Sequence, residues 1–261
     1  MAGGRRAPWL WLATLWFAGV AGDAQAALTE RIEGVSLQGT LQRVLVAHDD
    51  AQPVTRGLIV FPGGGGDLGL VDGPPAPPTP GTGYVASARR ELARSGTAVV
   101  LVDSPPARQP QMPLAYRESA EYRALLKQLV EHLRTRFANA QLYPFGYSNG
   151  AVSALVAAPE PGVAGVILVG GVFLRYADLA AFGVEVPLLV VHHETDRCIP
   201  PDFDESCRIR LRPTMVRSVA QAYGPAPCGP LSAHQFFGQE GVVADAIHGW
   251  LLTGRAASRL R

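Results

Sequence analysis

The pentapeptide Gly146-Tyr147-Ser148-Asn149-Gly150 has the pattern G-x-S-x-G, and it is the segment of this chain most suited to covalent chemistry. It follows the apolar run 141–145 and precedes a run typical of a helix, 151–158. A sharp turn between a strand and a helix exposes a serine as a nucleophile. The turn brings the residues two positions before and two positions after the serine close together, so only glycine fits there without a collision. A glycine-flanked turn serine without chemistry has the same pattern, so the rest of the chain must decide.

A serine hydroxyl is a poor nucleophile at neutral pH, so Ser148 needs a histidine as base and an acid that orients it. We expect His234 to be the base, because it lies in a loop between the last predicted strand and the final helix. The other histidines are His48 and His132 before the serine, His192 and His193 beside another strand, and His248 within an apolar helical pattern.

The predicted acid is Asp196, which lies in the loop after the apolar run 187–192. Glu194 is the alternative, whereas Asp202 and Asp204 lie too far along the loop. A metal site at His192-His193-Glu194 is disfavoured, because adjacent strand residues point to opposite faces. We therefore expect no metal and no organic cofactor.

An acyl-transfer site also needs donors for the oxygen that becomes negative. The apolar run 57–61 ends in Pro62-Gly63-Gly64-Gly65-Gly66. The backbone N–H groups of Gly64 or Gly65, with that of Asn149 after the serine, are the predicted oxyanion hole. A phosphate-binding loop is disfavoured, because no Gly-Lys-Ser/Thr follows the glycines.

Apolar runs alternate with helical patterns along the chain, which is typical of parallel strands joined by crossover helices. The predicted strands are 41–47, 57–61, 98–102, 141–145, 163–169, 187–192 and, more weakly, 216–222. The predicted helices include 84–95, 118–137 and 242–252. The segment 72–83 carries five prolines and is expected to be a surface loop, either solvated or forming a rim of the site.

Residues 1–26 resemble a cleaved secretory signal peptide: two arginines, an apolar stretch too short to span a bilayer comfortably, and Ala24-Gln25-Ala26. An uncleaved anchor is the alternative. We expect an exported protein, periplasmic or secreted, with residues 27–261 as one domain and no stable membrane span after cleavage. Without residues 1–26 the basic and acidic residues, 23 and 22 in the full chain, become 21 each. This balance gives no reason to expect a nucleic-acid partner.

The three cysteines, Cys198, Cys207 and Cys228, lie in the last third of the chain. An oxidising compartment favours one disulfide, but spacing alone leaves all three pairings open.

Together these motifs resemble the α/β-hydrolase superfamily from Leu41 to Leu252, including the chain order Ser148, Asp196, His234. The resemblance implies a mostly parallel central sheet with helices on both faces and little or no cap domain. The chain is also similar to small exported bacterial serine hydrolases with a cysteine just after the acid and another just before the histidine. That similarity implies a disulfide between Cys198 and Cys228. Proline at position 62, where many esterases have histidine, departs from the pattern.

The resemblance implies an exported serine hydrolase that cleaves small carboxylic esters through an acyl-enzyme. An amidase or an acyltransferase on the same fold is the nearest alternative, and a noncatalytic binding protein that keeps the scaffold is the alternative from another class. The sequence does not predict the acyl length or the oligomeric state.

Overall fold

The computed structural model describes residues 28–76, 83–171, 181–200, 211–217 and 223–260. The predicted signal peptide 1–26, Cys207 and part of the proline-rich segment 72–83 lie outside these described residues.

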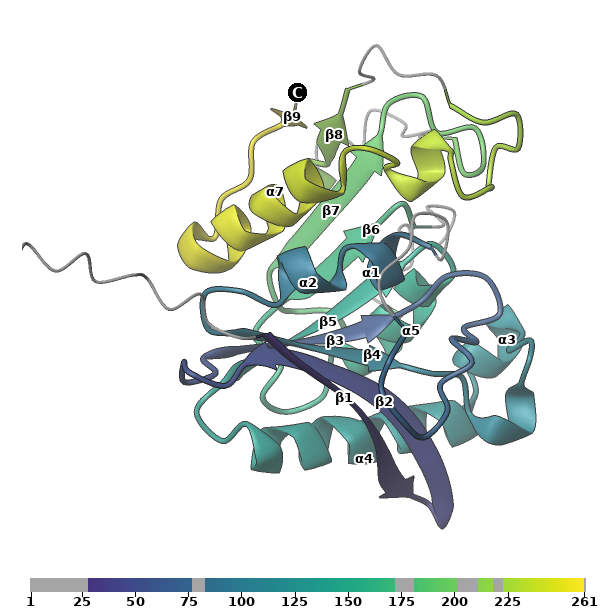
Figure 1. Cartoon of the computed structure of the whole chain (residues 1–261), viewed down its shortest axis with the longest axis vertical. Helices are drawn as coiled ribbons and strands as arrows, with labels where there is room; N and C mark the ends of the chain where they lie inside the picture. The colour runs from purple at the N-terminus through teal and green to yellow at the C-terminus, as the bar shows by residue number, and fades with distance from the viewer. Residues whose placement is uncertain (1–27, 77–82, 172–180, 201–210, 218–222, 261) are drawn as a thin grey trace, which may run out of the picture.

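The strands of the described residues form one sheet in the order β1-β2-β4-β3-β5-β6-β7-β8-β9 (Figure 1). Their bounds are β1 Leu28–Leu37, β2 Thr40–Asp49, β3 Arg56–Phe61, β4 Thr97–Val102, β5 Gln141–Tyr147, β6 Val166–Val169, β7 Leu188–His193, β8 Thr214–Val216 and β9 Arg259–Leu260. Strand β2 is antiparallel to β1 and β4, and every other pairing is parallel. The predicted class, a mostly parallel sheet with crossover helices, is confirmed.

Helices cover both faces of this sheet (Figure 1). Their bounds are α1 Tyr84–Ser87, α2 Arg89–Leu92, α3 Leu114–Arg117, α4 Ala120–Arg136, α5 Gly150–Ala157 and α7 Glu240–Thr253. Alternate residues of each strand face opposite sides. Accordingly, Ile59 and Phe61 pack in one core cluster with α4 and α5, and Leu58 and Val60 in another with α1, α2 and α7.

The elements differ from the sequence prediction mainly at the edges of the sheet. Strand β1 was not predicted, because its apolar residues alternate with charged ones and most of the strand is only half-buried. The predicted helix 84–95 is two short helices that meet at Ala88. Helix α4 begins at Ala120, where the Ser119 side chain accepts the N–H of Tyr122 as an N-cap. The predicted strand 216–222 corresponds to β8, which ends at Val216; residues 218–222 lie outside the description.

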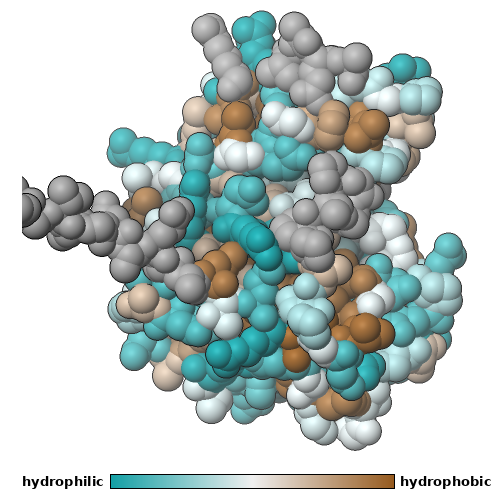
Figure 2. All heavy atoms as spheres, viewed as in Figure 1, coloured by the Kyte–Doolittle hydropathy of each residue, from teal (hydrophilic) through white to brown (hydrophobic). Residues whose placement is uncertain are grey.

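The surface in the same view is mixed: hydrophobic residues lie in small groups between hydrophilic ones (Figure 2). Among the described helices, none has the length and apolar character needed to cross a bilayer.

A buried ion pair fastens β1 to the helical layer. The Glu30 carboxylate accepts hydrogen bonds from Arg89 Nε at 2.7 Å and from Arg90 Nη2 at 2.8 Å. The Glu30 and Arg89 side chains are 7% and 4% exposed. Burial opposes ionisation of Glu30, but the hydrogen bonds and charges of the two arginines outweigh it and lower the pKa of Glu30. The pair therefore contributes stability at neutral pH, and that contribution is lost as the pH falls through this lowered pKa.

Removing this carboxylate leaves a buried guanidinium without a counter-charge. We expect Glu30→Gln to lower the free energy of unfolding by about 3 kcal/mol, measured by urea denaturation at pH 7. The matched control is Glu33→Gln on the same strand, whose pair with Arg136 is partly exposed and should contribute under about 1 kcal/mol. Equal losses from the two variants would contradict this assignment.

Candidate active site

Ser148 stands on a strained turn between β5 and α5. Its φ is 52°, in the left-handed region that non-glycine residues rarely occupy. A Cβ on Gly146 would lie 2.5 Å from the carbonyl oxygen of Gly150, and one on Gly150 would lie 2.1 Å from that of Phe61. The close backbone approach that the G-x-S-x-G pattern predicts is therefore present, and it explains both glycines.

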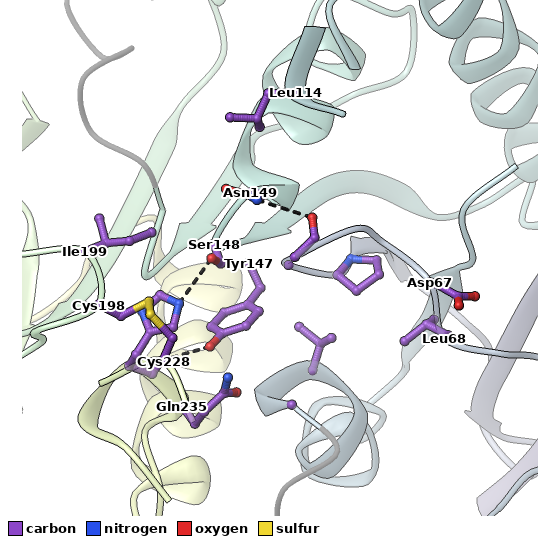
Figure 3. A pocket seen from close by; sticks show the side chains of 16 residues that line it. Asp67, Leu68, Leu114, Tyr147, Ser148, Asn149, Cys198, Ile199, Cys228 and Gln235 are labelled. Carbon is purple, nitrogen blue, oxygen red and sulfur yellow. Dashed lines mark hydrogen bonds between the residues drawn. A yellow bond between two sulfur atoms is a disulfide. The ribbon is translucent and has the colours of Figure 1, made fainter. Parts of the chain in front are cut away.

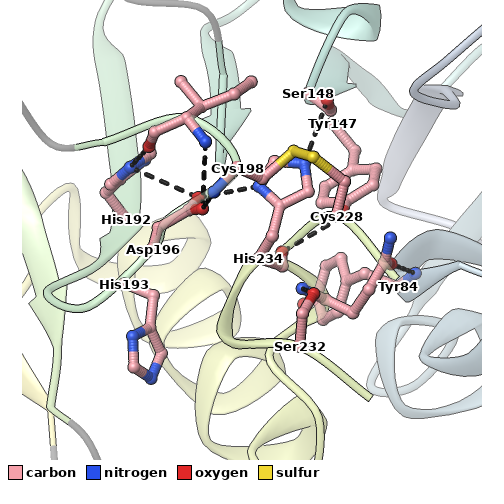
Figure 4. Close-up of polar contacts among 12 residues, drawn as sticks. Tyr84, Tyr147, Ser148, His192, His193, Asp196, Cys198, Cys228, Ser232 and His234 are labelled. Atoms are coloured by element: carbon pink, nitrogen blue, oxygen red, sulfur yellow. Dashed lines mark hydrogen bonds and ion pairs between the residues drawn. A yellow bond between two sulfur atoms is a disulfide. The ribbon is translucent and has the colours of Figure 1, made fainter. Parts of the chain in front are cut away.

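The structure brings Ser148, His234 and Asp196 together in one chain of hydrogen bonds (Figure 4). His234 Nε2 lies 3.1 Å from Ser148 Oγ, and His234 Nδ1 lies 2.7 Å from Asp196 Oδ2. Ser148 follows β5, and Asp196 follows β7. His234 belongs to the 3₁₀ turn Ala233–Gln235. All three are at most 8% exposed, so bulk water does not compete strongly for these contacts.

Asp196, and not Glu194, is the acid that contacts His234. Asp196 Oδ1 accepts the backbone N–H groups of Cys198 at 2.8 Å and Ile199 at 3.0 Å, which leaves Oδ2 for His234. The Glu194 carboxylate is partly exposed and lies 4.0 Å from Arg217 Nε. The two oxygens of Asp196 therefore have separate tasks, one holding the loop and one facing the imidazole.

His192 lies beside the carboxylate of Asp196 and contacts its loop. Its Nε2 lies 2.8 Å from the carbonyl oxygen of Ile199 and 3.5 Å from Asp196 Oδ2. Because both neighbours are acceptors, Nε2 carries the proton and donates. Burial lowers the pKa of His192 to about 4, so the ring is neutral at pH 7.

His193 points the other way and ties the acid loop to α7. Its Nδ1 accepts the N–H of Thr195 at 3.1 Å, and its Nε2 lies 3.0 Å from Gln239 Oε1. Adjacent His192 and His193 thus diverge, as alternating strand residues must. In the described parts of the chain, no three side chains of His, Cys, Asp or Glu type gather where they could hold a metal ion.

Two residues that the sequence does not single out, Tyr147 and Gly170, lie against the imidazole of His234. The Tyr147 ring lies 5.3 Å from the His234 ring, and its hydroxyl donates to the His234 carbonyl oxygen at 3.0 Å. Burial raises the pKa of the Tyr147 hydroxyl well above its usual range, which keeps the donor protonated. Gly170 has a φ of 55°, and a Cβ there would lie 3.5 Å from His234 Cε1. Tyr147 is a variable position of the G-x-S-x-G pattern, so the pattern gives no signal for it.

The predicted oxyanion donors are placed unequally. A Cβ on Gly63 would lie 2.8 Å from Ser148 Cβ, so the glycine loop lies directly against the nucleophile. Gly64 and Asn149 line the pocket with Ser148, whereas Gly65 is absent from the described lining. Of the three residues predicted to supply donors, Gly64 and Asn149 are therefore the two that face the pocket among the described residues.

The pocket beside Ser148 has a volume of about 560 Å³. Figure 3 shows the side chains that line it. Apolar side chains line much of it, namely Leu68, Val85, Leu114 and Ile199. Asp67 is the one acidic side chain in the lining of the described residues, which also includes Cys198 and Cys228.

Cys198 and Cys228 form a disulfide, the pair that the resemblance implied. Cys198 donates its N–H to Asp196, and Cys228 precedes the turn that carries His234. The bond therefore links the loop of the acid to the segment of the base.

The disulfide closes a loop with a sequence separation of 30 residues, and loop-closure entropy predicts about 3 to 4 kcal/mol of stabilisation from it. We expect dithiothreitol to lower the urea midpoint of the wild-type protein because the unfolded chain gains freedom. The double variant Cys198→Ala, Cys228→Ala serves as the control and should be insensitive to dithiothreitol. A wild-type midpoint that dithiothreitol leaves unchanged would count against this bond.

Comparison with known proteins gives structural matches only. No family model matches this chain, and no curated protein matches its sequence. A dienelactone hydrolase from Anabaena variabilis is 16% identical with a TM-score of 0.61, over 86% of this chain and 97% of that one. XC6422 from Xanthomonas campestris, described as an α/β serine hydrolase without a lid, is 18% identical with a TM-score of 0.56, over 85% and 94%.

A dienelactone hydrolase-like promiscuous phosphotriesterase from metagenomic libraries is 15% identical with a TM-score of 0.59, over 88% of this chain and 100% of that one. At identities this low, the structural matches show the fold but do not identify the substrate. The chain has the fold of the α/β-hydrolase superfamily.

Proposed function

We propose that this protein is a serine hydrolase that cleaves small carboxylic esters. The observation that carries the proposal is the buried chain of hydrogen bonds from Ser148 Oγ through His234 to Asp196, at the wall of a pocket. A hydroxyl, an imidazole and a carboxylate in this order supply a nucleophile, a general base and a group that orients the base.

In the proposed mechanism His234 Nε2 takes the proton of Ser148 Oγ as the oxygen attacks the ester carbonyl. Asp196 holds Nδ1–H and stabilises the imidazolium that forms. The backbone N–H groups of Gly64 and Asn149 donate to the oxyanion, and among the described residues neither group donates to a backbone carbonyl. The imidazolium then protonates the leaving alcohol. Water, activated by the same histidine, hydrolyses the acyl-enzyme and restores Ser148.

The pocket supports a small and largely apolar substrate, because its volume is about 560 Å³ and four aliphatic side chains line it. The names of the structural neighbours, dienelactone hydrolase and phosphotriesterase, agree with hydrolysis of an ester bond. An amidase or an acyltransferase would use the same groups on the same fold and remains the alternative within this class.

We also propose that the protein is exported. The expectation rests on residues 1–26, which have the charge and hydropathy pattern of a signal peptide. The disulfide between Cys198 and Cys228 supports it, because such bonds persist in oxidising compartments.

The first test is labelling with a fluorophosphonate probe, which reacts with activated serines. We expect the purified protein to be labelled at Ser148 and to hydrolyse p-nitrophenyl butyrate. Ser148→Ala should abolish labelling, and His234→Ala should lower turnover by roughly 10⁴-fold or more with the fold intact. A folded wild-type protein that the probe does not label would support the noncatalytic binding protein instead.

The second test concerns the acid. In Asp196→Asn the amide oxygen is expected to keep the N–H groups of Cys198 and Ile199, which turns the NH₂ group toward His234 Nδ1. Nδ1 must then accept, Nε2 carries the proton, and the ring can no longer take a proton from Ser148. We expect kcat to fall by roughly 10⁴-fold with little loss of stability.

The matched control is Glu194→Gln in the same loop, which should retain wild-type kcat. If the Glu194 variant were the inactive one, the assignment of the acid would be wrong. Steady-state kinetics of both variants on p-nitrophenyl butyrate decide between these results.

A further inference from the structure

Arg117, at the end of α3, is the largest fully buried side chain among the described residues. Its Nη1 donates to Ser153 Oγ at 2.7 Å, and its Nη2 donates to the carbonyl oxygen of Gly64 at 3.2 Å. Ser153 belongs to α5, the helix that follows the nucleophile, and it also accepts the Tyr122 hydroxyl at 3.2 Å. One guanidinium thus connects α5, the helix that follows Ser148, to the glycine loop at Gly64.

This cation has no counter-charge in the described residues, where its acceptors are all neutral oxygens. Burial lowers the pKa of the guanidinium, but an arginine stays protonated in proteins. A buried charge without a partner costs several kcal/mol of folding free energy. By contrast, the other buried arginine of the described residues, Arg89, is paired with Glu30.

The Gly64 carbonyl oxygen accepts a second hydrogen bond, from Asn149 Nδ2 at 3.3 Å (Figure 3). Gly64 has a φ of 55°, and a peptide between two glycines rotates easily. Rotation of the peptide between Gly64 and Gly65 would exchange the positions of the Gly64 C=O and the Gly65 N–H. Arg117 and Asn149 oppose that rotation because both donate to the Gly64 oxygen, and they thereby anchor Gly64 in the loop.

The loop also leaves room for the guanidinium. A Cβ on Gly66 would lie 2.9 Å from Arg117 Nη2, and Gly66 has a φ of 78°. The absence of a side chain at Gly66 therefore leaves space for the buried guanidinium of Arg117.

We propose that Arg117 is a positioning residue of the oxyanion hole: it anchors Gly64, the residue whose N–H is the candidate donor, through its carbonyl oxygen, and it supplies positive potential behind the oxyanion. This inference rests on the proposed ester hydrolysis. Arg117 has no counter-charge among the described residues, and we assign that role to the negative oxygen of the tetrahedral intermediate. Because a low-dielectric interior screens charges weakly, the attraction favours the transition state over the neutral substrate.

The test compares Arg117→Met, which removes the charge at similar volume, with the wild-type protein on p-nitrophenyl butyrate. We expect kcat to fall about 10- to 100-fold, less than or comparable to the loss of a direct oxyanion donor, while KM changes by less than about twofold. The inhibition constant of a trifluoromethyl ketone, which forms an oxyanion adduct on serine, should rise by a similar factor. A merely structural role would not produce this split between kcat and KM.

The matched control is Arg89→Met, which removes the other buried arginine on the opposite face of the sheet. It should lower stability but retain wild-type kcat per folded molecule. If Arg117→Met does not fold, Arg117→Lys decides: its ammonium cannot hold both acceptors at once, and we expect kcat at least about threefold lower with unchanged KM.

Wild-type kcat and wild-type ketone inhibition in a folded Arg117 variant would overturn the inference. The proposed function has a separate failure, because it predicts that the wild-type protein itself reacts with fluorophosphonate and turns over the ester. A wild-type protein that does neither would overturn the function, and with it this role of Arg117.

Discussion

The backbone of the turn around Ser148 lies in direct contact with the backbone at the end of β3, and the rest of the site depends on that contact. Gly150 packs on the carbonyl of Phe61, and Gly63 packs on Ser148 Cβ. Both approaches are so close that any side chain on either glycine would clash. This contact sets the serine beside the loop that carries the candidate oxyanion donors. Ser148 itself has a left-handed conformation, a cost that the surrounding sheet and helix must offset.

The groups that contact His234 and Asp196, namely Tyr147 and His192, are both neutral at pH 7. His192 is neutral because it is buried, and it donates a hydrogen bond beside Asp196 without competing with His234 as a cation. Tyr147 holds His234 by its ring and by its hydroxyl. Arg117 is the exception, a buried cation on the side where negative charge would develop. In the proposed acyl transfer, the acid would lie behind the base and the cation behind the oxyanion.

Much of this arrangement could be predicted from the sequence, because the serine turn, the acid loop and the histidine loop each follow an apolar run that ends at the same edge of a parallel sheet. Strand β1 could not, since an edge strand with alternating charges lacks the apolar run of an inner strand. Glycine spacing predicts a donor loop but not which glycine faces the pocket: Gly64 lines it, whereas Gly65 is absent from the lining among the described residues. A single arginine such as Arg117 gives no sequence signal of burial, because arginines are usually exposed and its partners lie 36 and 53 residues away.

The most direct test of the account is a crystal structure of the phosphonate adduct formed with the probe. The account predicts phosphorus bonded to Ser148 Oγ, with the phosphoryl oxygen within hydrogen-bond distance of the backbone N–H groups of Gly64 and Asn149 and with His234 Nε2 facing the adduct. Phosphorus on another residue, or a phosphoryl oxygen directed away from both N–H groups, would contradict it.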